Sequence, residues 1–523
     1  MQLLKVLSKE IIKSEWNMHM IEKLCHYIDA SFPIIYLHTF EETKADRIIF
    51  DVAKKVGRGV VEWDASNGQT EWDVTRKDPL IKKRLFEGTR TIEETLSTEK
   101  EGDSLSQKIL VLKDAHHFFD QPRIVSMLKD IGHMVLSGRV ETTIFIVSPV
   151  LTIPSEIEKY TTVLEIGYLD HDELEGVISE FFNDYEMPSI SRTLLNEMVM
   201  AFKGLTEYEI KNILALAYAH DGGFEKEDLK FIHDQKQQVI KKSGILEMID
   251  LKESLEDIGG LENLKKWLKR KAAIFNDLNR AIEFGVDMPK GVLIAGVPGC
   301  GKSLNAKAAA KLFNVPLLRL DMGRLLGKYV GESEANMRKA ISLAEAVSPC
   351  VLWIDEIEKA FAGIGGGGGA EVTTRLFGNF LTWMQEKTSP TFVVATANDI
   401  LKLPPELMRK GRFDEIFYVG LPNDAERKKI FEIHIGKRRK HDLSSINLNE
   451  LVLKTQGFSG ADIEGVVRDS IEAVFAEEKQ RLTTNDILNA IKNTNSLSEI
   501  MKDSIDKMSK EYERRKFKNA SLK

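Results

Sequence analysis

The most informative residues of this chain form a glycine-rich loop, in the run GVLIAGVPGCGKS from Gly291 to Ser303. Its glycines would let backbone N–H groups curl around phosphate oxygens, and a helix starting at the loop would add partial positive charge. Lys302 would reach the β- and γ-phosphates of a nucleotide, and the Ser303 hydroxyl would ligate Mg²⁺. These residue types at this spacing therefore predict a nucleotide site with a magnesium ion. The other residues expected in the cradle are Gly296, Pro298, Gly299, Cys300, Gly301 and Leu304.

Polar residues end two further apolar runs of the chain. Asp355 and Glu356 follow the first of these runs; Asp355 would hold Mg²⁺ through its water shell, and Glu356 would orient and polarise the attacking water. Acids often end strands, but a position 53 residues after Lys302 (355 − 302 = 53) strengthens the catalytic interpretation. Asn398 ends the second run and could reach the γ-phosphate or the water, although an Asn-Asp pair also suits an ordinary turn.

Two arginines, Arg409 and Arg412, lie in the segment LPPELMRKGRFD. At helical spacing, both would point from one face toward the nucleotide of a neighbouring molecule. Guanidinium groups there would neutralise charge that develops during phosphoryl transfer. Spacing alone favours the simpler alternative, which is two solvated surface arginines.

The elements that would position these groups alternate between strand and helix. Strand-like runs cover residues 292–295, 351–354 and 391–397, and a helix-like run covers 304–312. In a doubly wound sheet, ligands bind beyond the carboxyl ends of the strands, which is where the functional residues stand. We therefore expect an α/β fold with a mainly parallel sheet.

Length and composition bound the class of protein. A chain of 523 residues is too long for one ordinary core, so two or more domains are expected. The net charge of −7 gives no general argument for binding nucleic acid or a membrane. No run is long enough to span a membrane, and the N-terminal residues lack the apolar core of a signal peptide, so we expect a cytoplasmic location. The cysteines make no disulfide or zinc pattern; Cys300 is either a redox-sensitive thiol or a small tolerated residue.

The first half of the chain echoes the second half without its chemistry. The segment PIIYLHTFEETK, residues 33–44, lies over residues 291–302 at a constant offset of 258 (302 − 44 = 258). Asp114 matches Asp355, whereas Ala115 replaces the catalytic glutamate. Apolar strands also resemble one another by chance, but we expect a degenerate copy that binds no nucleotide. At the glycine positions of the loop stand His38, Glu41 and Thr43, and the carboxylate of Glu41 would repel phosphate.

This set of motifs resembles that of the AAA family of ATPases, over roughly residues 254–493. The phrases PIIYLHTFEE, ILVLKDAHHFF and LPPELMRKGRFDEIF extend the resemblance to tandem AAA proteins of bacteria, cyanobacteria and algal plastids with a degenerate first module. The resemblance implies two doubly wound modules with helical lids, ATP and Mg²⁺ as ligands, and a homo-oligomeric ring, usually of six subunits. It implies that Asn398 is a sensor and that Arg409 and Arg412 complete the site of the next subunit. It further implies contacts to the nucleotide from Asp257, Ile258, Gly259, His434, Gly460 and Ala461.

A segment between the loop and the acids resembles the first pore loop of the family. There Lys328, Tyr329 and Val330 would grip an extended polypeptide, unless Tyr329 packs into its own domain. The glycine run 365–369 would be a second pore loop or a plain flexible loop. The resemblance thus implies a MgATP-hydrolysing remodeller that acts on protein substrates through a central pore. The alternative is an ATP-gated scaffold or assembly factor that recruits a partner without threading it, and nucleic acid is not an expected partner.

The expected organisation has two modules and a tail. Residues 1–245 would form the degenerate module, with a core at about 30–170 and a lid at about 171–245. Residues 246–500 would form the active module, with a core at about 254–421 and a lid at about 422–495. Residues 238–254 would link the modules, and residues 501–523 would be a charged, solvated helix with a frayed end.

Overall fold

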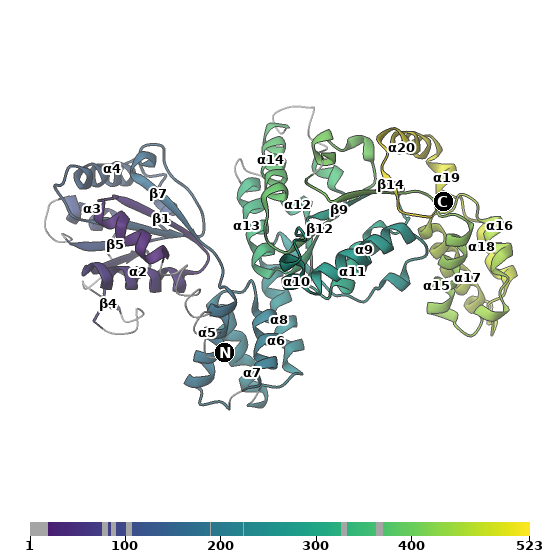
Figure 1. Cartoon of the computed structure of the whole chain (residues 1–523), viewed down its shortest axis with the longest axis horizontal. Helices are drawn as coiled ribbons and strands as arrows, with labels where there is room; N and C mark the ends of the chain where they lie inside the picture. The colour runs from purple at the N-terminus through teal and green to yellow at the C-terminus, as the bar shows by residue number, and fades with distance from the viewer. Residues whose placement is uncertain are drawn as a thin grey trace. The chain divides into compact units, whose positions relative to one another are not determined.

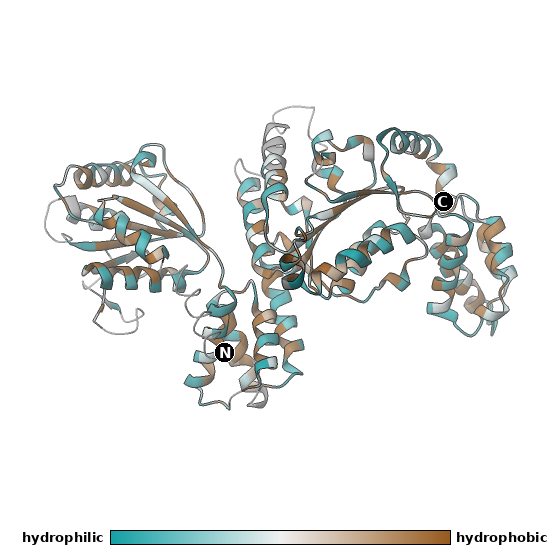
Figure 2. Cartoon of the chain, in the orientation of Figure 1, coloured by the Kyte–Doolittle hydropathy of each residue, from teal (hydrophilic) through white to brown (hydrophobic). Residues whose placement is uncertain are grey.

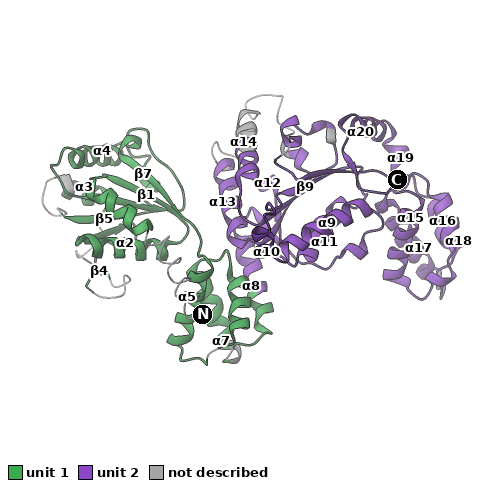
Figure 3. Cartoon of the chain, in the orientation of Figure 1, with its two compact units in different colours: residues 1–232 green, residues 233–523 purple. Residues whose placement is uncertain are grey.

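The computed structural model describes residues 19–522, except residues 76–81, 85–89, 101–106, 189, 223, 326–331, 362–369 and 410. The chain divides into two compact units between Ile232 and His233, inside helix α8 (Asp228–Lys242), whereas the sequence pattern places the boundary after residue 245 (Figure 3). Within the described residues, each unit contains a seven-stranded sheet flanked by helices (Figure 1). The expected α/β fold with two mainly parallel sheets is therefore confirmed.

The sheet of the first unit has the strand order β4-β3-β2-β5-β6-β1-β7, and the strands from β2 to β7 in this order run parallel. Ile35 and Leu37 of β1 face a core built with α2, and Ile34 and Tyr36 face a second core built with α3 and α4. Because helices cover both faces, the central strands are apolar nearly throughout (Figure 2). The elements of this layer are β1 (Ile34–Thr39), α2 (Glu42–Val56), β2 (Gly59–Asp64), β3 (Gly68–Trp72), β4 (Lys82–Arg84), α3 (Ile92–Lys100), β5 (Lys108–Lys113), α4 (Pro122–Leu136), β6 (Thr143–Ser148) and β7 (Thr161–Ile166).

A helical lid follows the first sheet. Two of its helices begin with a capping box: Asp170 with Glu173 starts α5, and Thr206 with Glu209 starts α7. In each box the side chains satisfy N–H groups that a helix start leaves unpaired. The lid helices are α5 (His171–Asp184), α6 (Arg192–Phe202), α7 (Glu207–Asp221) and α8.

The sheet of the second unit has the order β14-β13-β9-β12-β11-β10-β8, parallel except for β8. Val292 and Ile294 of β9 pack with Trp267 of α9 and Phe313 of α11 in the core on one face. The described elements are β8 (Leu246–Ile249), α9 (Glu262–Phe275), α10 (Leu278–Glu283), β9 (Gly291–Gly296), α11 (Lys302–Phe313), β10 (Leu317–Leu320), α12 (Met322–Leu325), α13 (Glu332–Val347), β11 (Cys350–Ile354), α14 (Ala370–Glu386), β12 (Thr391–Ala397) and β13 (Glu415–Val419).

A second lid and a C-terminal extension complete this unit. The lid helices enclose a small core of their own, which includes Phe431, Ile463 and Val467. No helix among the described residues is long and apolar enough to cross a membrane. The remaining helices and strand are α15 (Asp424–Arg439), α16 (Leu448–Lys454), α17 (Gly460–Ala476), α18 (Thr484–Lys492), α19 (Leu497–Ile500), α20 (Lys502–Arg515) and β14 (Lys518–Asn519).

The two sheets share one arrangement of strands, as the internal repeat predicts. The loop strand β1 lies between β6 and β7, and its counterpart β9 lies between β12 and β13. The strands that precede Asp114 and Asp355, β5 and β11, lie next to β6 and β12. The sheets differ at the edge that lies beyond β2 in the first unit and beyond β10 in the second. In the first unit this edge is formed by β3 and β4, which come after β2 in the chain, whereas in the second it is formed by β8, which comes before β9 in the chain. Among the described residues, a strand beyond β13 exists in the second unit alone, and this strand is β14.

Two segments that the sequence predicts to be loose are built into the second unit. Residues 238–254 are not a free linker, because they contain the end of α8 and the whole of β8, which pairs with β10. The C-terminal residues do not fray, because β14 pairs with β13 and Ala520 is fully buried. Charged residues surround this two-residue strand, and it is too short for a periodic pattern to reveal it.

Candidate active site

The glycine-rich loop joins β9 to the start of α11, as the motif requires. Gly299 has φ +70° and lies so close to the lid that an added Cβ would be 2.9 Å from the Cβ of Ala461. Gly301 has φ +84° with open space around it. The N-terminus of α11 directly follows, so its free N–H groups and partial positive charge favour an anion at this point.

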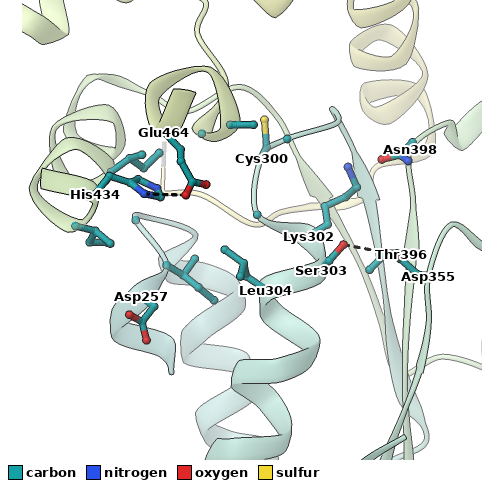
Figure 4. A pocket seen from close by; sticks show the side chains of 18 of the residues that line it. Asp257, Cys300, Lys302, Ser303, Leu304, Asp355, Thr396, Asn398, His434 and Glu464 are labelled. Carbon is teal, nitrogen blue, oxygen red and sulfur yellow. Dashed lines mark hydrogen bonds and ion pairs between the residues drawn. The ribbon is translucent and has the colours of Figure 1, made fainter. Parts of the chain in front are cut away.

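Two side chains at the start of α11 face the pocket (Figure 4). Lys302 Nζ donates to the carbonyls of Gly296 and Val297, at 2.9 and 2.7 Å. Burial lowers the pKa of Lys302 to about 8, because little water is left to solvate the ammonium. Ser303 Oγ donates to Asp355 Oδ1 at 3.2 Å, and these hard oxygens are ligands of the kind that Mg²⁺ prefers.

A buried threonine that the sequence analysis missed connects the Asp355 carboxylate to the backbone of Glu356. Thr396 Oγ1 donates to Asp355 Oδ1 at 2.5 Å and accepts the N–H of Glu356 at 3.1 Å. Thr396 is only 1% exposed and lies on β12, two residues before Asn398. Alternate strand residues share a face, so this spacing from Asn398 is the signal that identifies it.

Asn398 and Glu356 are in direct contact. Asn398 Nδ2 donates to Glu356 Oε1 at 2.7 Å, and Lys359 forms an ion pair with the other carboxylate oxygen. A second missed residue, Glu358, accepts the backbone N–H of Asn398 at 2.9 Å. Burial raises the pKa of Glu358, and its Oε2 is buried without a partner among the described atoms. Glu358 thus anchors the turn that carries the Asn398 amide.

The opposite wall of the pocket combines a core segment with lid helix α15. Gly259 lies so close to α15 that an added Cβ would be 2.5 Å from Ile430 Cγ1. Asp257 pairs with Lys437 of α15 at 2.8 Å, and this hydrogen-bonded partner lowers the pKa of Asp257 to about 2. His434 Nδ1 lies 3.7 Å from Glu464, and burial lowers the pKa of this histidine. The His434 imidazole therefore lines this side of the pocket.

Together these walls enclose a pocket of about 340 Å³ between the core and the lid. Three features of this pocket fit MgATP: the open space at Gly301, the start of α11, and the pair of hard oxygens from Ser303 and Asp355. Gly296 and Pro298 belong to the loop without lining the pocket. The predicted residues that do line it are Asp257, Ile258, Gly259, Gly299, Cys300, Gly301, Lys302, Ser303, Leu304, Asp355, Glu356, Asn398, His434, Gly460 and Ala461.

The two predicted arginines lie outside this pocket. Arg409 is exposed and lines a separate groove with Gly411 and Arg515, and Arg412 donates to the carbonyl of Glu406. The expected helical spacing is wrong, because Arg409 has extended angles of φ −71° and ψ 139° and Gly411 has φ +96°. The two guanidinium groups therefore do not share a helical face.

Cys300 lies in the glycine-rich loop, but its environment does not favour a reactive thiolate. Burial raises the pKa of Cys300 to about 11, against the smaller opposite effect of Lys302. A thiol with such a pKa is almost entirely protonated near neutral pH and is a poor nucleophile. The alternative of a small tolerated residue therefore fits the structure better than a redox switch.

The corresponding place in the first unit is filled by the chain itself. Glu41, at the position of Gly299, is 2% exposed, and its Oε2 accepts the N–H of Glu207 at the start of α7. Lys44, at the position of Lys302, forms a 2.8 Å ion pair with Glu173 of α5. Burial raises the pKa of Glu41 to about 7. Contacts between core and lid thus involve both of the positions that correspond to Gly299 and Lys302. The predicted pore residues Lys328, Tyr329 and Val330, and the glycine run 365–369, lie outside the described residues.

Sequence comparisons match AAA-type domain models in both halves of the chain. The ATPase family associated with various cellular activities (AAA) matches residues 292–421, and the AAA+ lid domain matches residues 445–489. The N-terminal domain of SpoVK-like AAA ATPases matches residues 20–166, and their second domain matches residues 172–243.

Individual relatives cover most of the chain. The AAA domain-containing protein ycf46 of Guillardia theta is 38% identical over 473 residues, which are 89% of each chain. Its namesake from Pyropia yezoensis is 34% identical over 510 residues, 97% of this chain and 100% of the relative. A cell division cycle protein 48 homologue from Archaeoglobus fulgidus is 37% identical over 224 residues, 41% of this chain and 30% of the relative. Because these matches span both units at such identity, the chain belongs to the AAA family of ATPases, and its N-terminal domains are of the SpoVK-like type.

Proposed function

We propose that the second unit binds MgATP between its core and lid and hydrolyses it to ADP and phosphate. The observation that carries this proposal is the network of Asp355, Glu356, Thr396 and Asn398. In this network Glu356, our candidate for the residue that activates water, lies beside the Ser303–Asp355 pair, our candidate magnesium ligands. Family membership supports the same activity.

Each side chain of the pocket has a separate role in the proposed hydrolysis. Lys302 leaves its carbonyl partners to bind the β- and γ-phosphates, and the N–H groups of the loop hold the oxygens around them. Ser303 and Asp355 would hold Mg²⁺, which would supply positive charge to offset the negative charge that develops on the phosphates. Glu356 accepts a proton from the attacking water at its Oε atoms, while Asn398 keeps that carboxylate in place.

We propose that the arginine comes from a second copy of the chain. Among the described residues that line the pocket there is no arginine, and Arg409 is exposed on another surface. A guanidinium in trans would complete the site and would make turnover depend on assembly. The ring of six subunits that the family resemblance implies satisfies this requirement, because each subunit then donates to the next one.

We propose that the ring remodels protein substrates by threading them, with Tyr329 as the gripping residue of the pore. The alternative is an ATP-gated scaffold that recruits a partner without threading. Tyr329→Ala separates the two functions. Loss of substrate remodelling with ATPase activity retained supports threading, whereas no effect on how the partner protein is recruited or remodelled supports the scaffold.

The test of the ATPase proposal is a titration of activity against protein concentration. Activity per chain should rise steeply as the oligomer forms, and Arg409→Ala with Arg412→Ala should abolish it while nucleotide still binds. Native mass spectrometry with ATP and Glu356→Gln gives the number of subunits. Full activity in isolated single copies would disprove completion of the site in trans.

A further inference from the structure

The C-terminal residues of the chain hold both ends of the segment that carries the arginines. We call residues 405–412 the arginine loop, and we call α20, β14 and residues 520–522 the C-terminal brace. The arginine loop starts with the 3₁₀ turn Pro405–Met408 and leads into β13 at Glu415. Arg409 itself is exposed and extended, so neighbouring elements must fix its place.

At the first end of the loop, α20 lies against the turn. Arg515 Nη1 contacts Met408 Sδ at 2.6 Å, one residue before Arg409. The helix also packs on the short 3₁₀ turn Ile400–Lys402, which precedes the arginine loop. Arg515 is held in turn by Glu511, one turn earlier on the same helix.

At the second end, β14 extends the sheet beside β13. Phe417 pairs with Lys518, and Tyr418 pairs with Asn519. The rings of Tyr418 and Tyr512 stack with centroids 4.4 Å apart, so α20 and β13 also contact each other through side chains. An ion pair between Lys518 and Glu415 lies at the first residue of β13.

The far end of the brace reaches the nucleotide side of the same unit. The carbonyl of Ala520 accepts the N–H groups of Asn263 and Leu264 at 3.0 and 3.2 Å. Asn263 Nδ2 donates to the carbonyls of Asn519 and Ser521 at 3.1 and 2.8 Å. These bonds satisfy N–H groups in the first turn of α9, which begins at Glu262, three residues after the Asp257–Gly259 wall of the pocket. One short segment therefore contacts both the arginine loop and the helix that follows the nucleotide wall.

The first unit provides an internal comparison. Its strand β7 corresponds to β13, but among the described residues no strand extends the sheet beyond it. In the sequence, Leu151 of the first unit aligns with Leu401 of the second, an offset of 250 (401 − 151). At the start of the next strand the offset is 254 (415 − 161), because Thr161 and Glu415 pair with corresponding residues of β1 and β9. The first unit is thus four residues shorter where the second carries its arginine loop. The added strand and the arginines occur together.

We propose that the C-terminal brace positions Arg409 and Arg412 for the neighbouring subunit's nucleotide, with Tyr512 and Arg515 as its principal positioning residues. This inference rests on the proposed completion of the site in trans. A misplacement of about 1 Å at a reacting centre costs roughly 100-fold in rate, so a loose arginine loop would fail even with both arginines present.

Two differently tagged chains, co-expressed and purified through both tags, test this directly. The donor chain carries Lys302→Ala and keeps its arginines, whereas the acceptor chain carries Arg409→Ala and Arg412→Ala and keeps its cradle. ATP hydrolysis in the mixture occurs only where the arginines of a donor chain reach the nucleotide bound in the phosphate-binding loop of an acceptor chain. Arg515→Ala or Tyr512→Ala is then placed in either chain.

We expect either brace variant to lower kcat about 10-fold or more when it is in the donor, with the KM for ATP unchanged. The same variant in the acceptor should change the rate less than twofold. Arg514→Ala is the matched control, because Arg514 pairs with the same Glu511 but is exposed, whereas the bond to Met408 comes from Arg515. Hydrogen exchange of residues 405–415 should increase in the Arg515 and Tyr512 variants alone.

Each other result has a definite meaning. An equal loss from donor and acceptor would show that the brace only supports the fold, and the positioning role would be wrong. Unchanged rates with both brace variants in the donor would also overturn it. If the unmodified donor and acceptor pair shows no hydrolysis at all, the proposal of an arginine supplied in trans fails, and the inference fails with it.

Discussion

Thr396→Val removes the hydroxyl that joins the Asp355 carboxylate to the backbone N–H of Glu356. The side chain keeps its shape, but Asp355 loses a 2.5 Å donor and the N–H of Glu356 loses its 3.1 Å acceptor. Because Thr396 is 1% exposed, water cannot replace either partner without a rearrangement. The change therefore acts on the orientation of both acids at once.

The size of the effect follows from the kinds of bond that are lost. A hydrogen bond to a charged group contributes about 1.5–3 kcal/mol, and each 1.36 kcal/mol is a factor of ten in rate. If the full bond to Asp355 is lost in the transition state, kcat falls about 10- to 100-fold. The concentration of Mg²⁺ that gives half-maximal rate should rise, because Asp355 is no longer held in one orientation.

Steady-state ATPase assays against ATP and Mg²⁺, together with thermal unfolding, measure these effects. Thr391→Val is the matched control: Thr391 is fully buried on the same strand, but its Oγ1 donates to the carbonyl of Ala344, away from the pocket. Both variants should lose stability by about 1–2 kcal/mol, and only Thr396→Val should lose kcat. Thr396→Ser should keep most of the rate. Equal rates for Thr396→Val and Thr391→Val would refute the argument that this hydroxyl orients the acids.

Three further outcomes are expected. Glu356→Gln should bind nucleotide with unchanged affinity and hydrolyse it at least about 100-fold more slowly, and normal turnover would remove Glu356 from the role of base. In the first unit, burial raises the pKa of Glu41 from 4.5 to about 7, so its contribution to stability is full below pH 4.5 and is lost as the pH rises through 7. Amide hydrogen exchange at the start of α7, corrected for intrinsic rates, should therefore increase from pH 6 to pH 8 in the wild type and stay constant in Glu41→Gln. Both proteins should bind one nucleotide per chain, and two nucleotides per chain would show that the first unit also has a working site. Because burial raises the pKa of Cys300 to about 11, a thiol reagent at pH 7.5 should label Cys300 slowly and Cys300→Ala should keep its ATPase rate; rapid inactivation that ATP prevents would contradict this.

The sequence predicted which residues meet in the candidate site where contiguous motifs contain them. Lys302, Ser303, Asp355 and Asn398 each end or follow an apolar strand, so their meeting at one sheet edge follows from the parallel topology. Thr396 needed one more step, namely its shared strand face with Asn398. Assignments that came from the family resemblance, such as His434, also line the pocket, although no local pattern marks a single histidine on a helix.

Other features could not be predicted because tertiary contacts decide them. The spacing of Arg409 and Arg412 indicated a helix, but Gly411 at φ +96° and an extended Arg409 break that periodicity. Strands β8 and β14 are short, and their pairing partners lie far away in the chain, so composition indicated a linker and a tail. Glu358 lies in a 3₁₀ turn, so no periodic sequence pattern connects it to Asn398, whose backbone N–H it accepts.

The two edges of the second sheet come from opposite ends of its own stretch of chain, and this order affects synthesis. Strand β8 is translated before the loop strand, whereas β14 is translated after every lid helix. While the ribosome is still adding the lid, β13 lacks the neighbour that will pair with it, and an unpaired edge readily joins other strands. A nascent or truncated chain that stops before Lys518 therefore leaves the edge of β13 unpaired directly after its arginines, where another strand can add to it.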